Sequence, residues 1–306
     1  ILPATTSLER NDISIKHWDQ TISPMYKAIE PIGESKSDYE IFSEIASKLN
    51  FKDKFTEGKD EDKWLRFIWD EARSKAKDEG FTLPEFDKFW KNGFQEVLSP
   101  KKQTILLEKF RIDPEKNPIS TPSGKIEIFS ETVDSFKYED CPGHPVWLEQ
   151  EEWLGSNLTK QYPLQLISGQ PHNRLHSQLD NGSESQSYKI LGREPIKIHP
   201  QDAQARRLVD GDVVEVFNKR GKCLAGVIVS NEVMKGVVFL PVGAWYDPIN
   251  DGEFCIHGNP NVLTEDIGTS SLAQGPSAHS TLVEIKKYTK ELPEISIFHK
   301  PNIVNK

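Results

Sequence analysis

The residues of this chain best suited to chemistry lie between positions 164 and 180, which read LQLISGQPHNRLHSQLD. The mostly apolar run 164–167 suits a β-strand, and Gly169 and Pro171 then break the pattern. Residues 172–178 carry hydrogen-bonding side chains at every position except Leu175. A strand that breaks into such a segment is typical of a binding loop. An ordinary polar loop is the alternative, but so many groups able to donate to phosphates or to heterocycle edges favour binding.

A second polar stretch, residues 257–275, reads HGNPNVLTEDIGTSSLAQG. It contributes the carboxamides of Asn259, Asn261 and Gln274. A carboxamide carries a donor and an acceptor side by side, so it can pair with the amide-like edge of a pterin or a purine. The Asn-Pro and Gly-Thr-Ser steps are also turn-forming sequences, and a plain turn is the alternative for any single Asn. The two stretches together form the candidate site.

The elements that must position these stretches are short strands. After residue 164 the apolar runs are brief and are separated by turn signals, and Pro200 suits the first turn of a short helix. Six short strands with one short helix favour a closed β-barrel. We expect the strands at residues 164–167, 195–198, 213–217, 223–229, 237–240 and 281–285.

The first part of the chain is predicted to be mainly helical. Ser37 and Glu40 have the spacing of a capping box at a helix start. Apolar residues at helical spacing predict three helices with inward-facing sides. These helices are expected at residues 37–49, 61–79 and 84–97, a strand is expected at residues 125–129, and the domain boundary is placed near residue 155.

Composition excludes several classes of function. The 306 residues include 38 Lys and Arg against 47 Asp and Glu, which gives a formal net charge of −9. Such a balance argues against nucleic acid or an anionic membrane as the main partner. No run of 18 apolar residues occurs, so we expect no membrane span. The chain begins within an apolar pattern and without an initiator Met, and we interpret it as a fragment of a longer protein.

The three cysteines do not indicate a metal cluster. Cys141, Cys223 and Cys255 form no C-x-x-C pair, whereas zinc and iron–sulfur sites need clustered ligands. Cys223 opens an apolar strand, and a buried free Cys behaves as a small hydrophobic residue. We therefore expect Cys223 and Cys255 to be packing residues and predict no metal ligand in this chain. Near the N-terminus, residues 9–12 (ERND) are either a ligand-facing polar cluster or a solvated loop.

The two polar stretches, in this order, resemble the C-terminal cofactor-binding domain of the dimethyl sulfoxide reductase family of molybdopterin enzymes. The nearest branch in this resemblance is that of the trimethylamine-N-oxide and biotin or methionine sulfoxide reductases. Residues 2–13 (LPATTSLERNDI) and 121–127 (TPSGKIE) extend the resemblance over nearly the whole chain. It implies an α+β fold, with an incomplete helical domain at residues 1–155 followed by a double-psi β-barrel at residues 156–306. Periodicity alone does not select that barrel topology.

The resemblance implies the cofactor and the residues that face it. In this family, two molybdopterin guanine dinucleotides hold one molybdenum. Arg174 would suit a pyrophosphate, because its planar fork makes charge-assisted bonds to phosphate oxygens. Ser168 and Ser177 could complete a phosphate cradle, Gln170 and His176 would face the pterin edge, and Asn261 and Gln274 would pair with pterin or guanine. The full set of expected cofactor-facing residues is Ser168, Gln170, His172, Arg174, His176, Ser177, Asn259, Asn261 and Gln274.

The implied function is reduction of N-oxides or S-oxides, such as trimethylamine N-oxide, biotin sulfoxide or methionine sulfoxide. This branch ligates molybdenum through a serine in an earlier domain, and no segment of this chain corresponds to it. We therefore assign no catalytic residue and expect no activity from the chain alone. The implied partners are the N-terminal part of the same enzyme and a cytochrome-type electron donor, and the implied location is periplasmic. The competing hypothesis is a barrel that serves as a binding or adaptor module without metal chemistry.

Overall fold

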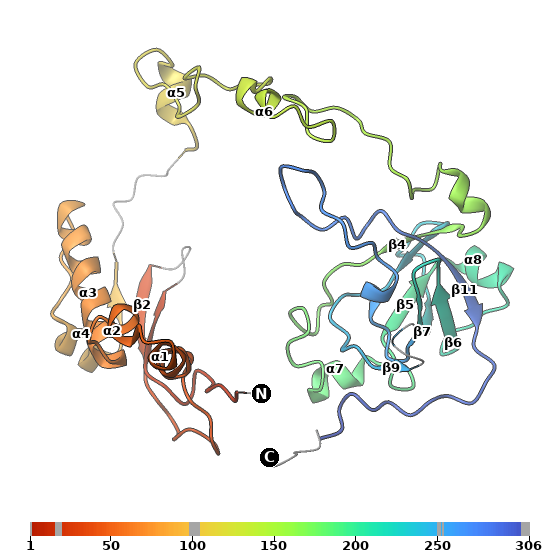
Figure 1. Cartoon of the computed structure of the whole chain (residues 1–306), viewed down its shortest axis with the longest axis horizontal. Coiled ribbons are helices and arrows are strands. Elements are labelled where there is room, and N and C mark those ends of the chain that lie inside the picture. Colours follow the sequence, from red (N-terminus) through yellow and green to blue (C-terminus); the bar gives the residue numbers. More distant parts are fainter. Residues whose placement is uncertain (1, 16–19, 98–104, 250–251, 253, 301–306) are drawn as a thin grey trace. The chain divides into compact units, whose positions relative to one another are not determined.

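The computed structural model of the chain describes residues 2–15, 20–97, 105–249, 252 and 254–300. It separates into two compact units, Ile1–Pro118 and Ile119–Lys306 (Figure 1). Each unit has its own sheet and its own hydrophobic core. The expected α+β class is confirmed. The domain boundary near residue 155 stays a prediction about domain organisation.

The first unit packs helices against a small antiparallel sheet. Its strand order is β1-β2-β3, with Asp12 opposite Met25 and Ile22 opposite Gln95. The aromatic rings of Trp69 and Phe89 stack with centroids 3.8 Å apart at the centre of the core. The elements are β1 (Asp12–Ile15), β2 (Thr21–Met25), α1 (Asp38–Lys48), α2 (Lys52–Thr56), α3 (Glu61–Asp78), α4 (Phe86–Asn92), β3 (Gln95–Glu96) and α5 (Glu108–Ile112).

Helix starts were predicted better than helix faces. The capping box is present, because the Glu40 N–H donates to the Ser37 hydroxyl and the Ser37 N–H donates to the Glu40 carboxylate. The expected inward faces of the first two helices were partly wrong. In α3 the helical period places Trp64, Phe67, Ile68 and Ala72 on the inward side. The buried residues are instead Leu65 and Trp69, and Phe67 and Ile68 are exposed. Several large apolar residues lie on the exposed side of α1 and α3, so the helical period alone did not reveal which side the unit buries.

The second unit begins with a segment of little regular structure, residues 119–163. It contains only the short helices α6 (Glu131–Ser135) and η1 (Asn157–Lys160) among its described elements. The strand expected at residues 125–129 is wrong. Ile126 and Ile128 are both exposed there, and the alternating pattern finds no partner strand among the described residues.

The second unit is built around a closed six-stranded barrel. The strands follow the order β5-β8-β4-β11-β6-β7, and β7 pairs again with β5. The pairs β4–β8 and β5–β7 are parallel, and the four other neighbouring pairs are antiparallel. All six predicted strands are present, and the double-psi β-barrel is confirmed. They are β4 (Leu164–Ile167), β5 (Pro195–Ile198), β6 (Val213–Phe217), β7 (Lys222–Val229), β8 (Val237–Phe239) and β11 (Leu282–Lys287).

Alternation along the strands fills the barrel interior. Leu164 and Leu166 of β4 face the same core as Ile196 and Ile198 of β5, as expected for a period of two. Cys223 and Cys255, both fully buried, lie opposite each other in the parallel pair β7–β10 and belong to this core. The smaller elements are α7 (Ser183–Ser187), α8 (Pro200–Ala205), β9 (Pro248–Ile249), β10 (Phe254–Cys255) and η3 (Pro260–Val262).

Candidate functional site

The first polar stretch forms a loop that bonds to itself after β4 ends. The Gln170 Oε1 atom accepts a hydrogen bond from the His176 N–H at 3.0 Å. The Gln170 Nε2 atom lies 2.7 Å from Nδ1 of the His176 ring. His176 adopts a left-handed backbone with a φ of 50°. A non-glycine residue is uncommon in that region and is held there by its surroundings.

This loop lies on the segment that follows β8. The Arg174 Nη2 atom donates to the Val242 carbonyl at 2.9 Å, and Nε donates to the His176 carbonyl at 3.1 Å. The Trp245 indole N–H donates to the Ser177 carbonyl at 2.7 Å. Side chains from both segments thus satisfy main-chain carbonyls and fix how the loop meets the barrel.

The second polar stretch is fixed by Asn259 at the start of η3. Its Oδ1 atom accepts from the Asn261 N–H at 2.9 Å, and its Nδ2 atom donates to the Ala244 carbonyl at 2.9 Å. Asn259 therefore caps η3 and ties the second stretch to the same 242–246 segment. The Asn261 side chain is exposed and takes part in none of the hydrogen bonds of the described residues. Its carboxamide is free to bind a ligand.

The two stretches meet around one cavity of about 600 Å³. His176 and Ser177 reach it from the first stretch, and Asn259 and Asn261 reach it from the second. The wall between them is formed by residues 242–246, with Ile297 at the margin. Four of the nine residues expected from sequence are thus brought together.

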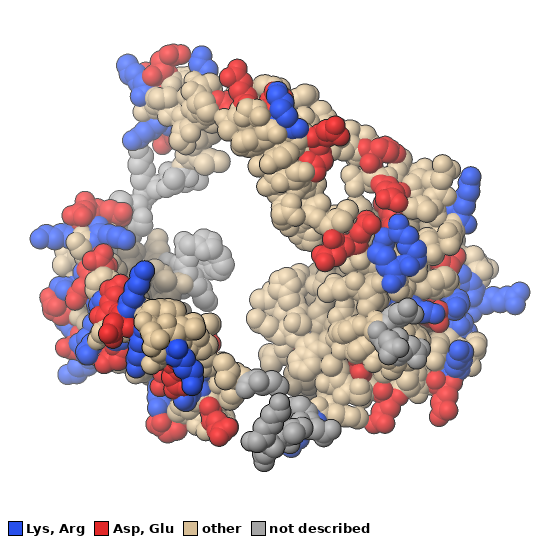
Figure 2. All heavy atoms as spheres, viewed as in Figure 1, with Lys and Arg blue, Asp and Glu red and all other residues tan. Residues whose placement is uncertain are grey.

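A second cavity, of about 360 Å³, lies on the other side of the first loop. Gln170, His172 and Asn173 line it, with Tyr188 and Phe239 among its apolar neighbours. The loop therefore presents polar side chains to two cavities. Figure 2 shows that the visible surface of this unit around α7 and β9, as located in Figure 1, carries few charged side chains.

The three remaining predicted residues line neither cavity. The side chains of Ser168 and Arg174 are buried, and Ser168 Oγ and Arg174 Nη1 have no hydrogen-bond partner among the described residues. Gln274 lies in the turn between residues 268 and 276, where its Nε2 atom donates to the Ser270 carbonyl. The pyrophosphate role expected of Arg174 stays a prediction, although the ion pair of Arg174 with Glu194, 3.0 Å long, favours a different role.

Sequence reasoning missed the acidic partners of Arg174. It left two alternatives open for the residues of the cavity wall. Trp245 and Tyr246 line the larger cavity, whereas Asp247 is buried and accepts hydrogen bonds from Ser296 and Ile297. From sequence, these three residues could line a substrate funnel or pack the barrel. No local signal pointed to the acidic partners of Arg174, because an isolated Asp or Glu reads as a surface residue.

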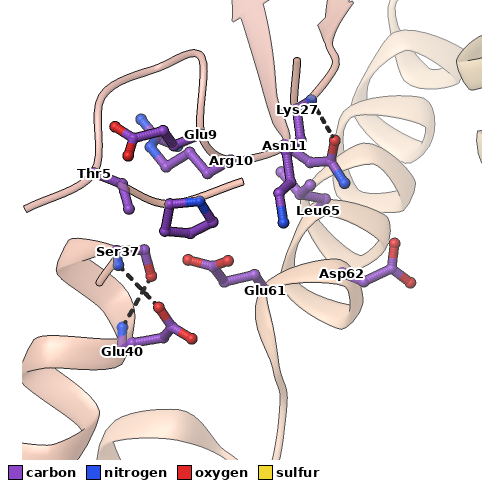
Figure 3. A pocket seen from close by; sticks show the side chains of 11 residues that line it. Thr5, Glu9, Arg10, Asn11, Lys27, Ser37, Glu40, Glu61, Asp62 and Leu65 are labelled. Carbon is purple, nitrogen blue, oxygen red and sulfur yellow. Dashed lines mark hydrogen bonds between the residues drawn. The ribbon is translucent and has the colours of Figure 1, made fainter. Parts of the chain in front are cut away.

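The polar segment at residues 9–12 lies beside a cavity of about 280 Å³ in the first unit (Figure 3). The Glu9 carboxylate accepts hydrogen bonds from the N–H groups of Thr6 and Ile32, both at 2.7 Å. These two bonds, the one from Thr6 first, lower the pKa of Glu9. Asn11 accepts from the Lys27 N–H at 2.8 Å. Glu9 is buried and shapes the loop, so it is not a solvated surface charge.

Within the described part of the chain, no group of three or more His, Cys, Asp or Glu side chains is arranged to hold a metal ion. None of the described helices combines the length and apolar character needed to cross a membrane.

Comparison with known proteins adds the family relationship of both regions. Residues 164–282 match the family described as "Molydopterin dinucleotide binding domain", and residues 1–48 match the family described as "Molybdopterin oxidoreductase". All nine expected cofactor-facing residues fall inside the first match. The solved structure of acetylene hydratase from Pelobacter acetylenicus is similar, with a TM-score of 0.67 at 20% identity over 94% of this chain and 38% of that one. At this identity the likeness concerns the fold alone.

Curated relatives are similar over nearly the whole chain. Trimethylamine-N-oxide reductase of Haemophilus influenzae is 44% identical over 99% of this chain and 38% of its own length. Trimethylamine-N-oxide reductase 1 of Escherichia coli K12 is 45% identical, over 97% of this chain and 36% of its own. Dimethyl sulfoxide/trimethylamine N-oxide reductase of Rhodobacter capsulatus is 45% identical, over 94% of this chain and 36% of its own length. The chain thus spans little more than a third of the length of these relatives.

Proposed function

Because this chain belongs to the molybdopterin oxidoreductase family, we propose that its barrel binds molybdopterin guanine dinucleotide and that the complete enzyme removes oxygen from N-oxides or S-oxides. The observation that carries the proposal is the convergence of His176, Ser177 and Asn261 on one cavity. These residues come from stretches about eighty positions apart. A barrel used only as an adaptor has no need for such a meeting of hydrogen-bonding groups.

The chemistry of this donor set fits the cofactor. An imidazole, a hydroxyl and a carboxamide offer hydrogen-bond donors and acceptors, which suits the amide-like edges of pterin and guanine. Ser168 Oγ and Arg174 Nη1 add buried polar atoms without a partner among the described residues. The cavities on both sides of the first loop, about 600 and 360 Å³, give room for parts of two dinucleotides.

Within this proposal, the chain binds, orients and shields. The bound molybdenum supplies the two-electron chemistry by which the substrate oxygen leaves as water. His176 and Ser177 orient one heterocycle edge, and Asn261 pairs with another. The rings of Trp245 and Tyr246 exclude water from the cavity wall that they line. We assign no metal ligand to this chain.

Substrate, location and electron donor concern the whole enzyme. The names of the relatives favour trimethylamine N-oxide, and the name of one of them adds dimethyl sulfoxide. A periplasmic location and a cytochrome-type electron donor belong to the proposal on the resemblance alone. Biotin sulfoxide and methionine sulfoxide are the competing substrates.

The test is steady-state turnover by the complete enzyme on a panel of N-oxides and S-oxides, with a reduced viologen as electron donor. We expect turnover on at least one N-oxide, together with molybdenum and pterin in the purified protein. The matched control is the same protein from cells grown without molybdate, which should be inactive. A folded complete protein that contains neither molybdenum nor pterin would overturn the proposal.

A further inference from the structure

We propose that a buried charged cluster, formed by Arg174, Asp180, Lys189, Glu194 and His257, holds the two cofactor-facing stretches in register. The inference rests on the proposed function, because it assigns these five side chains a positioning role toward the same cofactor. None of them lines the larger cavity between the two stretches, and of the five only Glu194 contributes to the lining of the smaller one.

The cluster is almost completely removed from water. The exposed fractions of its five side chains lie between 0% and 2%. Lys189 Nζ lies 2.8 Å from Asp180 Oδ1 and 2.8 Å from Glu194 Oε2, and so bridges the two carboxylates. Arg174 Nη2 lies 3.0 Å from the other oxygen of Glu194. Lysine and the acidic residues are seldom fully buried unless they are paired, and the ion pairs within the cluster are what permit their burial here.

The cluster reaches the backbone of the first stretch through Arg174. Its guanidinium donates to the carbonyls of His176 and Val242 and so fixes the loop against the cavity wall. Asp180 joins the end of the loop to the same wall, because its Oδ2 atom accepts a hydrogen bond from the Trp245 N–H at 2.9 Å.

The cluster reaches the second stretch through Glu194 and His257. The Glu194 N–H donates to the His257 carbonyl at 3.1 Å, while its side chain holds Arg174 and Lys189. Nδ1 of His257 lies 2.8 Å from the Trp245 carbonyl. A Cβ atom on Gly258 would lie 2.6 Å from Cβ of Glu194, so only glycine permits this approach. Glu194 therefore links both stretches, one through its side chain and the other through its main chain.

The charges of the cluster balance. Burial lowers the pKa of His257, the charge of Lys189 lowers it further, and the ring is neutral at pH 7. Two cations then face two anions. Removing one charge leaves an uncompensated charge in a medium of low polarity, whereas removing an opposite pair leaves the balance intact. If the cluster acts as one charge-balanced unit, removing an opposite pair of charges should therefore do less damage than removing either charge alone. If its residues were separate ligands, the two losses should add.

The experiment uses the complete enzyme and compares single variants with a charge-balanced double variant. Asp180→Asn and Lys189→Met each unbalance the cluster, and the double variant Asp180→Asn/Lys189→Met restores the balance. The readout is the release rate of oxidised pterin and the molybdenum remaining per folded protein after gel filtration. We expect each single variant to release cofactor at least about tenfold faster, and the double variant to recover most of that loss.

A matched control separates positioning from general stability. Ile285→Ala removes a buried side chain of the barrel core without touching the cluster. We expect it to lower the melting temperature while the folded fraction keeps its normal cofactor complement. Lys189→Arg keeps the charge and should retain cofactor better than Lys189→Met, and this comparison decides the matter if Asp180→Asn fails to fold.

Two results would overturn the inference. One is normal retention in both single variants. The other is a loss of cofactor that accompanies a lowered melting temperature in Ile285→Ala to the same extent as in the cluster variants. Either result leaves the proposed function intact as long as the unmodified enzyme carries molybdenum and pterin. Absence of both from the unmodified enzyme would instead contradict the proposed function itself.

Discussion

Gly243 lies directly against His176. A Cβ atom built on Gly243 would come within 1.8 Å of the His176 carbonyl oxygen, and Gly243 has a φ of +96°, where side chains are rarely tolerated. The first polar stretch therefore rests on a backbone that has no side chain at the point of contact. This contact sets the distance between the loop and the wall of the larger cavity.

Gly243→Ala should displace the first stretch and weaken cofactor binding. The backbone strain alone costs roughly 1–3 kcal/mol, and the clash with the His176 carbonyl adds to it. Gly211→Ala is the matched control, because Gly211 has a φ of +83° but nothing within 4 Å of its Cβ position. We expect both variants of the complete enzyme to melt earlier and only Gly243→Ala to lose pterin. Equal pterin content in the two variants would contradict this account of the contact.

The barrel could be predicted from sequence because its signals are local. Each strand is a short run rich in apolar residues, and the run from Val213 to Phe217 is present with the predicted bounds. The helix at Pro200 also begins where the proline predicts, with His199 as its N-cap. The double-psi connectivity depends on long-range pairing, such as Gln165 with Val237, which no local pattern encodes. Only the resemblance supplied it.

The site was predictable in its exposed members and unpredictable in its buried ones. Asn261 and Ser177 were identified because polar residues gather near strand ends and turns. The side chains of Lys189 and Glu194 are buried, although isolated charges in a sequence indicate the surface. The strand expected at residues 125–129 failed for a related reason, since a strand needs a partner and alternation does not provide one.

Cys223 and Cys255 should be inert in the folded chain. Both are free and fully buried, and burial, followed by the neighbouring Cys255, raises the pKa of Cys223 well above its usual value. The Cys223 thiol therefore stays protonated at pH 8. Titration of the native chain with Ellman's reagent at that pH should modify the partly exposed Cys141 and spare the other two. Modification of all three at the same rate would show that β7 and β10 are not packed as described.

Glu152 and Arg220 should make the barrel unit sensitive to acid. Arg220 donates to both Glu152 oxygens at 2.6 and 2.8 Å, and the Leu282 N–H donates to Oε2 at 2.9 Å. Burial opposes ionisation of Glu152, but these hydrogen bonds and the charge of Arg220 outweigh it and lower its pKa. A lowered folded pKa means that the stabilisation is present above the unfolded carboxyl pKa of about 4.3 and is lost as pH falls through the folded value.

Glu152→Gln should therefore cost about 1–3 kcal/mol at pH 7 and progressively less below pH 4. The measurement is thermal unfolding of the 306-residue chain, with and without Glu152→Gln, at pH 7 and at a pH below 4. Glu57→Gln is the control, because Glu57 pairs with Lys59 on the surface and is more than half exposed. A Glu152→Gln effect that does not change with pH would contradict the charge-based account.

The 306-residue chain alone should not reduce N-oxides or S-oxides. It spans 38% of the length of its Haemophilus influenzae relative, and we assign no metal ligand within it. Without that ligand the cofactor lacks a complete cage. Oxidation of a reduced viologen by the purified chain with trimethylamine N-oxide measures this. Turnover above the rate without protein would contradict it.

The central claim is that the two polar stretches form one cofactor site, and Asn261→Asp in the complete enzyme tests it most directly. The change replaces a donor by a second acceptor at nearly constant shape. Once the bound cofactor covers residue 261, a mismatch of that kind costs roughly 1–3 kcal/mol, or about fivefold to somewhat over a hundredfold in affinity. Asn157→Asp makes the same chemical change at an exposed position of η1 that lines neither cavity of the barrel unit. The measurement is pterin and molybdenum per folded protein, alongside the melting temperature. We predict a loss of cofactor at an almost unchanged melting temperature in Asn261→Asp and none in Asn157→Asp, whereas full cofactor occupancy in Asn261→Asp would contradict the assignment of this cavity to the cofactor.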